Sequence, residues 1–138
     1  MRNVLFDTNV ILDVLLERKG LYVTSGLALS FVDSGKVAGF VSAHAIPTIY
    51  YVAHKSEGAS VARQKTEDLC AHLQVAAVNA QVIQKAFACP IADFEDALTH
   101  VAAEITKCDL IVTRNIKHFL KGSIRTVLPD IFLQLMES

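Results

Sequence analysis

Asp109-Leu110-Ile111-Val112-Thr113 is the stretch that decides the fold. Three large apolar residues between polar ones are typical of a short strand that is buried on both faces of a sheet. The same pattern occurs near the N-terminus, where Val4-Leu5-Phe6 stops at Asp7. Weaker patterns of the same kind predict further short strands at residues 39–42, 74–78 and 125–128.

Helical patterns separate these strands. They are expected at residues 10–16, 22–34, 44–55, 60–72, 81–88, 93–107 and 129–136. Strands that alternate with helices pair in parallel through crossovers. We therefore expect an α/β fold of three layers (α/β/α), with a central parallel sheet of about five short strands. No linker or repeat interrupts the chain, so residues 1–138 are expected to form a single domain.

The composition excludes an intrinsically disordered chain. Hydrophobic residues make up 52% and charged residues 20% of the 138 residues, whereas disordered chains are rich in charge and poor in apolar residues. The formal net charge of −1 gives no overall attraction to polyanions. Nucleic-acid binding would therefore need a local basic patch or a bound cation.

The mean hydropathy of +0.39 raises the question of a membrane. The longest stretch without Asp, Glu, Lys or Arg is 37–54, and it contains two His residues and Pro47. It is too polar for a spanning helix, and the N-terminus has no apolar segment long enough for a secretion signal. The odd set of Cys70, Cys89 and Cys108 contains no CxxC motif, which favours a reducing cytoplasm.

In open parallel sheets, ligands bind outside the carboxyl ends of the strands. That rule directs attention to the residues after Phe6, Ser42, Val78 and Val112. Asp7, Thr8 and Asn9 follow the first of these ends. Capping of the next helix explains one such side chain, but three polar side chains are more than one cap requires.

A second acidic group opens the helix at 93–107. Asp93 and Asp96 lie one helical turn apart on the same face. For Asp93, helix capping with Asp96 in the first turn is as good an explanation as a functional role. Asp96, however, borders an apolar face beside another carboxylate, which is costly unless a cation neutralises it. Glu95 is expected to face solvent.

Polar residues also follow the strand at 109–113. Thr113 and Asn115 stand at its end, and Arg114 and Lys117 are candidate phosphate contacts, with ordinary surface charge as the alternative. No zinc-binding or nucleotide-binding motif occurs, and His44 and His54 are interpreted as structural. Carboxylates without thiolate or imidazole partners favour Mg²⁺ or Mn²⁺. Such an ion activates water and clamps phosphate, so the sequence predicts phosphodiester hydrolysis.

At this point the chain resembles the PIN-domain family, in the VapC-like toxin ribonuclease branch whose helix start reads like Asp93-Phe94-Glu95-Asp96-Ala97-Leu98. The other marks are 4–10, 40–43 and 111–115, in matching order. The resemblance implies a parallel sheet with flanking helices and an acidic site for Mg²⁺ or Mn²⁺. Its metal ligands would be Asp7, Asp96 and Asp93, and its supporting residues Thr8, Asn9 and Thr113.

Two positions depart from the family pattern. Thr48 stands where many members carry Glu, and Asn115 stands where the fourth acid is usual. Hydroxyl and amide oxygens can bind a hard cation but add no negative charge. We therefore expect weaker metal affinity, one metal rather than two, and weak or conditional activity.

The leading hypothesis is a Mg²⁺- or Mn²⁺-dependent endoribonuclease, the toxin of a toxin–antitoxin pair. Its catalytic set would be Asp7, Asp96, Asp93 and Asn115, and its expected partners are RNA, an antitoxin protein and a second copy of the chain. The alternative is a degenerate PIN domain that binds RNA or protein without cleaving. A phospho-acceptor receiver domain fits poorly, because Val75-Ala76-Ala77-Val78 runs into Asn79 rather than Asp.

Overall fold

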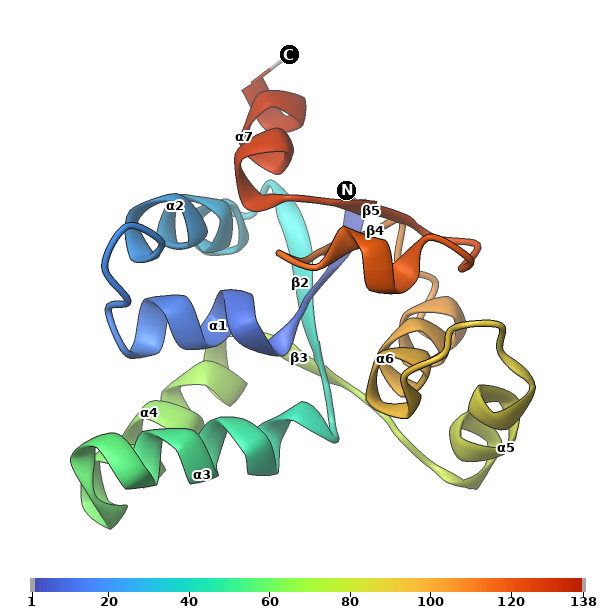
Figure 1. Cartoon of the computed structure of the whole chain (residues 1–138). Helices are drawn as coiled ribbons and strands as arrows, with labels where there is room; N and C mark the ends of the chain where they lie inside the picture. The colour runs from blue at the N-terminus through green and yellow to red at the C-terminus, as the bar shows by residue number, and fades with distance from the viewer. Residues whose placement is uncertain (1, 138) are drawn as a thin grey trace.

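A five-stranded parallel sheet forms the centre of the computed structural model, which describes residues 2–137 (Figure 1). The strand order is β3-β2-β1-β4-β5, and every neighbouring pair is parallel. The strands are β1 (Arg2–Phe6), β2 (Val37–Ser42), β3 (Gln74–Ala76), β4 (Leu110–Val112) and β5 (Arg125–Val127). The predicted fold class is confirmed.

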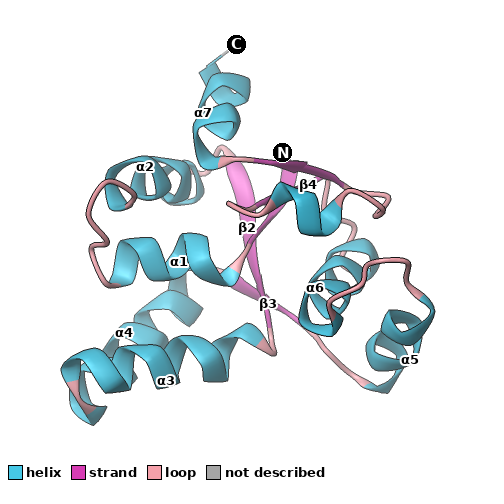
Figure 2. Cartoon of the chain, viewed as in Figure 1, coloured by secondary structure: helices cyan, strands magenta, loops and turns pink. Residues whose placement is uncertain are grey.

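Helices cover both faces of this sheet (Figure 2). They are α1 (Thr8–Leu15), α2 (Tyr22–Asp33), α3 (Ala45–Glu57), α4 (Ala59–His72), α5 (Ala80–Ala88), α6 (Phe94–Ile105) and α7 (Pro129–Glu137). A short 3₁₀ helix, η1 (Ile116–Phe119), follows β4 and was not predicted. In Figure 1, α1 and α2 lie to the left of the sheet and α5 and α6 to the right.

Element boundaries differ from the prediction by small amounts with identifiable causes. The strand predicted at 39–42 begins at Val37, because Val37 and Ala38 pair with Arg2 and Asn3 of β1. The strand predicted at 74–78 ends at Ala76, where its pairing with Ser42 ends. The helix predicted to reach 107 ends at Ile105, and Lys107 adopts a left-handed φ of 63°.

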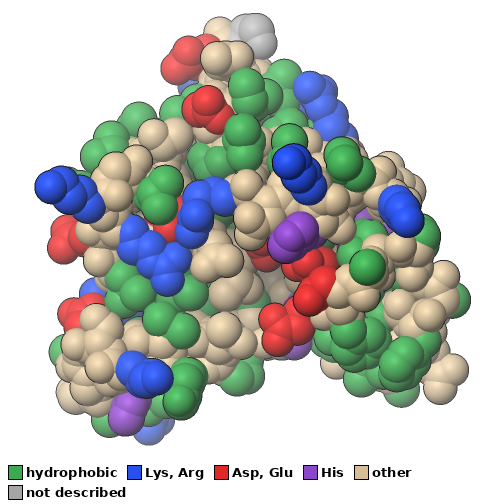
Figure 3. All heavy atoms as spheres, in the orientation of Figure 1, with side chains coloured by type: hydrophobic (Ala, Val, Ile, Leu, Met, Phe, Trp, Pro, Cys, Tyr) green, Lys and Arg blue, Asp and Glu red, His purple; other side chains and the backbone are tan. Residues whose placement is uncertain are grey.

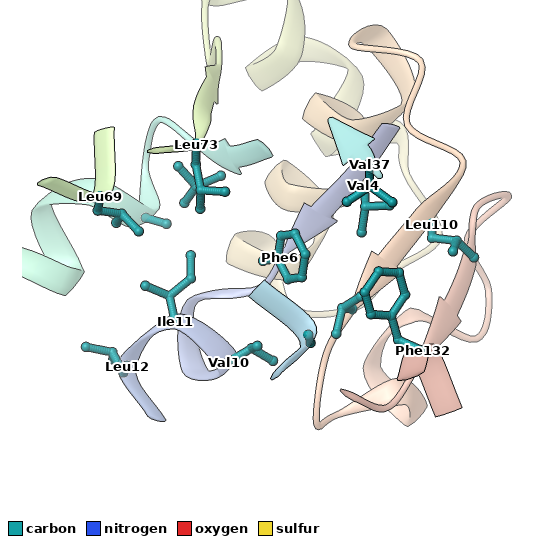
Figure 4. Packing of buried hydrophobic residues seen from close by; sticks show 14 of the residues in the cluster. Val4, Phe6, Val10, Ile11, Leu12, Val37, Leu69, Leu73, Leu110 and Phe132 are labelled. Carbon is teal, nitrogen blue, oxygen red and sulfur yellow. The ribbon is translucent and has the colours of Figure 1, made fainter. Parts of the chain in front are cut away.

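Strand residues alternate between two apolar cores. Val4 and Phe6 point into the core under α1, α2 and α7, where Phe6 meets the ring of Phe132 edge to face at 5.9 Å (Figure 4). Leu5 and Ile111 point to the opposite core, against α5 and α6. Burial on both faces accounts for much of the apolar share of the composition. No helix within residues 2–137 has the length and apolar character needed to cross a membrane.

The topology creates a crevice beside the central strand. From β1 the chain moves outward through β2 to β3, and then returns to β4 and β5 on the other side of β1. The connections that leave the carboxyl ends of β1 and β4 therefore diverge, and such a switch point is the usual ligand site of an open parallel sheet.

The loop after η1 is fixed to α6 by a buried histidine. The Nε2 atom of His100 accepts hydrogen bonds from the backbone N–H groups of Ser123, at 2.9 Å, and Ile124, at 3.3 Å. Burial lowers the pKa of His100, with Glu104 opposing, so the neutral ring can keep Nε2 as an acceptor. A Cβ atom on Gly122 would lie 2.6 Å from the ring of His100.

We expect Gly122→Ala to lower the free energy of unfolding by about 1–3 kcal/mol, because the added Cβ would lie 2.6 Å from the buried ring of His100 and would force the ring or the turn to shift. The matched control is Gly26→Ala in α2, where an added Cβ meets nothing within 4 Å. The control should be neutral or stabilising, since Ala favours helix over Gly. Urea unfolding of both variants is the measurement, and equal stabilities would contradict the expectation.

Candidate active site

Asp7 stands at the centre of the crevice. It follows β1 and is the N-cap of α1, where its Oδ1 accepts a hydrogen bond from the backbone N–H of Thr8 at 2.9 Å. Its Oδ2 accepts a hydrogen bond from Oγ1 of Thr113 at 2.8 Å. Thr113 is fully buried and Asp7 is 8% exposed. Thr8, which follows β1, and Thr113, which follows β4, therefore hold the Asp7 carboxylate in a fixed orientation.

Helix α6 brings two more carboxylates to this point. Asp93 is its N-cap and accepts a hydrogen bond from the backbone N–H of Asp96 at 3.0 Å. The Oδ2 atom of Asp96 lies 3.0 Å from Nδ1 of His118. Burial, then the charges of Asp93 and Asp7, raise the pKa of Asp96 to about 6, although His118 opposes the shift. Asp7, Asp93 and Asp96 thus face the same site, and His118 contacts one of them.

A polar hollow of about 340 Å³ joins these groups. The predicted residues that line it are Asp7, Thr8, Asn9, Thr48, Asp93, Asp96 and Asn115. Figure 3 shows acidic side chains gathered near the middle of this face, with Lys and Arg side chains to their left. The ends of β1, β2 and β4 all contribute residues to the hollow, but the end of β3 contributes none.

The remaining predicted residues lie around this hollow without lining it. Thr113 is buried beneath Asp7. Lys117 lines an adjoining hollow, which shares Asp93 and His118 with the first. Arg114 turns away toward Asp13, and it lines a separate hollow beside Pro129.

Four further ionisable side chains line the hollow and were not predicted as site residues: His44, His118, Arg18 and Glu95. His44 was interpreted as structural. It follows β2, and its Nε2 lies 3.3 Å from Oγ1 of Thr99 and 3.2 Å from the backbone oxygen of Glu95. Burial lowers the pKa of His44. Glu95 is exposed, as expected, but also borders the hollow.

Asp13 is a buried acid that was not predicted as a functional residue. It is fully buried in α1, and Oγ of Ser25 donates to its Oδ2 at 3.3 Å. Arg114 donates from Nη2 to Oδ1 at 3.1 Å and brings Nε within 2.8 Å of Oδ2 as an ion pair, without the alignment of a hydrogen bond. Arg18 adds Nη1 at 3.4 Å from Oδ1. A single acid within the apolar run Ile11-Leu12-Asp13-Val14-Leu15 was the available signal.

The turn after α1 places Arg18 beside this carboxylate. The backbone N–H of Arg18 bonds to the carbonyl of Asp13 at 3.0 Å, and that of Glu17 bonds to the carbonyl of Val14 at 3.2 Å. This is a Schellman motif, and Glu17 takes the left-handed position with φ of 48° that usually holds glycine. The turn folds Arg18 back along α1 toward Asn9.

The donor set suits a hard divalent cation. Its carboxylate, amide and hydroxyl oxygens are the ligands that Mg²⁺ and Mn²⁺ favour. The pKa of Asp96 is raised by burial and then by the charges of Asp93 and Asp7, and a cation would offset these effects. Within residues 2–137, no three His, Cys, Asp or Glu side chains already stand close enough together to hold a metal ion. Binding would therefore require these carboxylates to move closer to one another.

Sequence comparison decides the family. The family model described as "PIN domain" matches residues 3–117. The chain belongs to the PIN-domain family. The matched residues include Asp7, Asp93, Asp96 and Asn115, whereas β5 and α7 lie beyond them. A search of curated protein sequences finds no match to this PIN domain.

Solved structures share the fold. A toxin–antitoxin complex from Klebsiella pneumoniae contains a chain with a TM-score of 0.71 and 20% identity, over 91% of this chain and 97% of that one. VapBC2 from Rickettsia felis, bound to a promoter DNA fragment, gives 0.70 and 15% over 91% and 98%. VapC20 from Mycobacterium tuberculosis, a toxin that cleaves the sarcin–ricin loop, gives 0.63 and 13% over 78% and 86%.

Proposed function

We propose that this PIN domain is a Mg²⁺- or Mn²⁺-dependent endoribonuclease and the toxin of a toxin–antitoxin pair. The convergence of Asp7, Asp93 and Asp96 on one hollow at the switch point of the sheet is the observation that carries the proposal. It is supported by membership of a nuclease family and by the structural likeness to toxins of VapBC complexes.

Asp7, Asp93 and Asp96 would hold the metal, with Asn115 as a neutral oxygen donor. A bound ion of this kind lowers the pKa of water and neutralises phosphate charge. Thr113 and the backbone of Thr8 keep both oxygens of Asp7 in place. Nδ1 of His118 lies 3.0 Å from Oδ2 of Asp96, so His118 would have to yield this oxygen to a cation. Thr48 and Asn9 line the hollow and would have supporting roles.

The partners follow from the same proposal. RNA is the substrate, an antitoxin protein is the inhibitor, and a second copy of this chain completes a homodimer. Large exposed apolar side chains support a protein partner, and among them Phe87 is 75% and Leu120 71% exposed. The three free cysteines are consistent with a cytoplasmic location.

The test is cleavage of structured RNA by the purified protein with Mg²⁺ or Mn²⁺, followed on a denaturing gel. We expect cleavage with either ion, and its loss when excess EDTA is added. The same RNA with Ca²⁺ is the control for nonspecific divalent effects. Undiminished cleavage in EDTA would refute metal dependence.

A second function, binding without cleavage, is favoured by two neutral residues in the hollow. Thr48 and Asn115 add oxygen atoms but no charge, which reduces the attraction for a divalent cation. Under this alternative, the protein would bind RNA or a protein partner, show no cleavage with any ion, and gain no thermal stability from millimolar Mn²⁺.

A further inference from the structure

Arg18 is a cation at the edge of an acidic hollow. It lines the hollow together with Asp7 and Asp96, and its side chain is 32% exposed. Its Nη1 donates to Oδ1 of Asn9 at 3.3 Å and contacts Oδ1 of Asp13 at 3.4 Å. Among residues 2–137, its Nε and Nη2 have no hydrogen-bond partner. Asn9 and Asp13 therefore hold Nη1, whereas Nε and Nη2 are available to bind a ligand.

The charge of Arg18 is only partly neutralised. Asp13 is a single carboxylate shared between two guanidinium groups, and Arg114 makes the shorter contacts, at 2.8 and 3.1 Å. Each guanidinium group carries a formal charge of +1 and Asp13 carries −1. The cluster of Asp13, Arg18 and Arg114 therefore carries a net positive charge immediately beside the carboxylates.

We propose that Arg18 is a positioning residue that binds an RNA phosphate next to the one that is cleaved. This inference rests on the proposed ribonuclease function and names a contact within that site. A guanidinium matches the geometry of a phosphate, and anchoring by Asn9 and Asp13 reduces the entropy lost on binding. The net charge of −1 gives no overall attraction for a polyanion. Arg18, which lies beside the site acids, supplies such an attraction locally.

The other cations near the hollow fit this role less well. Arg114 has Nε and Nη2 turned to Asp13 and lines a different hollow. Lys117 is exposed and lines the adjoining hollow rather than this one. Arg18 alone among these three lines the hollow that contains the carboxylates.

The test compares Arg18→Gln and Arg18→Lys with Lys19→Gln, which removes the same charge from the neighbouring exposed residue. Binding of a short fluorescein-labelled single-stranded RNA is measured in EDTA by anisotropy, over a range of KCl concentrations. For Arg18→Gln we expect Kd to rise about 10-fold, as for a lost hydrogen bond to a charged group. The slope of log Kd against log salt should fall by roughly 0.7.

In cleavage assays with Mn²⁺, Arg18→Gln should raise KM for RNA by a similar factor and leave kcat within about threefold of wild type, since the lost contact is made equally in ground and transition states. Lys19→Gln should change neither constant. Equal affinities and salt slopes for Arg18→Gln and Lys19→Gln overturn the proposal. If Arg18→Gln does not fold, the Arg18→Lys variant is the test. A Kd at least about threefold above wild type supports phosphate binding by the guanidinium group of Arg18, and an unchanged Kd overturns it.

The outcomes separate this inference from the function on which it rests. Wild-type protein that neither binds nor cleaves RNA overturns both. Wild-type protein that cleaves RNA, with Arg18→Gln equal to it in KM, Kd and salt slope, overturns only the role of Arg18.

Discussion

The Asp7→Asn variant is expected to cleave RNA at least about 100-fold more slowly than wild type, the effect of removing one group that stabilises charge in the transition state. Asp7 is the least exposed of the three site acids and has both oxygens held. The amide removes the negative charge but keeps the shape. Its oxygen can still accept from Thr8, and Oγ1 of Thr113 can accept from its NH₂ group. The fold should therefore persist while metal binding weakens.

Single-turnover cleavage with Mn²⁺ measures this effect, and Asp130→Asn is its control. Asp130 is an exposed acid in the first turn of α7, away from the hollow, so its loss changes the net charge equally. Asp130→Asn should cleave like wild type and retain the rise in melting temperature that Mn²⁺ gives to a metal-binding protein. Asp7→Asn should lose that rise. A wild-type rate for Asp7→Asn would show that Asp7 is not a metal ligand.

The sequence was sufficient for the fold because the strands carry their own signal. Leu110-Ile111-Val112 and Val4-Leu5-Phe6 are fully apolar in a chain whose helices have mixed patterns, and burial on both faces is the physical reason. The positions of Asp7 and Asp93 followed from the same reasoning. Each comes where a helix begins, and each is an N-cap in the structure.

The surroundings of the acids could not be predicted, because they depend on contacts between distant segments. His118 reaches Asp96 only because η1 folds the chain back toward α6. Arg114 was a candidate phosphate contact with ordinary surface charge as the alternative, and the structure turns it toward Asp13, which lies 101 residues earlier. His44 follows a strand end that the switch-point rule had indicated, yet a single histidine in an apolar segment gives no distinct signal.

Asp13→Asn is expected to lower the free energy of unfolding by about 3 kcal/mol, near the lower end for breaking a buried ion pair by removing one partner. Asp13 is fully buried, whereas Arg18 and Arg114 are 32% and 29% exposed. The two guanidinium groups would lose their shared counter-charge at close range. Their partial contact with water offsets some of that cost, which is why the lower end applies.

Urea unfolding measures the loss, with Asp33→Asn as the matched control. Asp33 pairs with His72 at 3.3 Å, but both side chains are more than 60% exposed, so its loss should cost less than about 0.5 kcal/mol. Asparagine at position 13 leaves no cavity, so a large effect would come from charge rather than packing. Because Asp13 also holds Arg18, Asp13→Asn should weaken RNA binding in EDTA, whereas Asp33→Asn should not. A loss of stability below about 1 kcal/mol would mean that the arginines do not need this carboxylate, since surface substitutions of that size are ordinary.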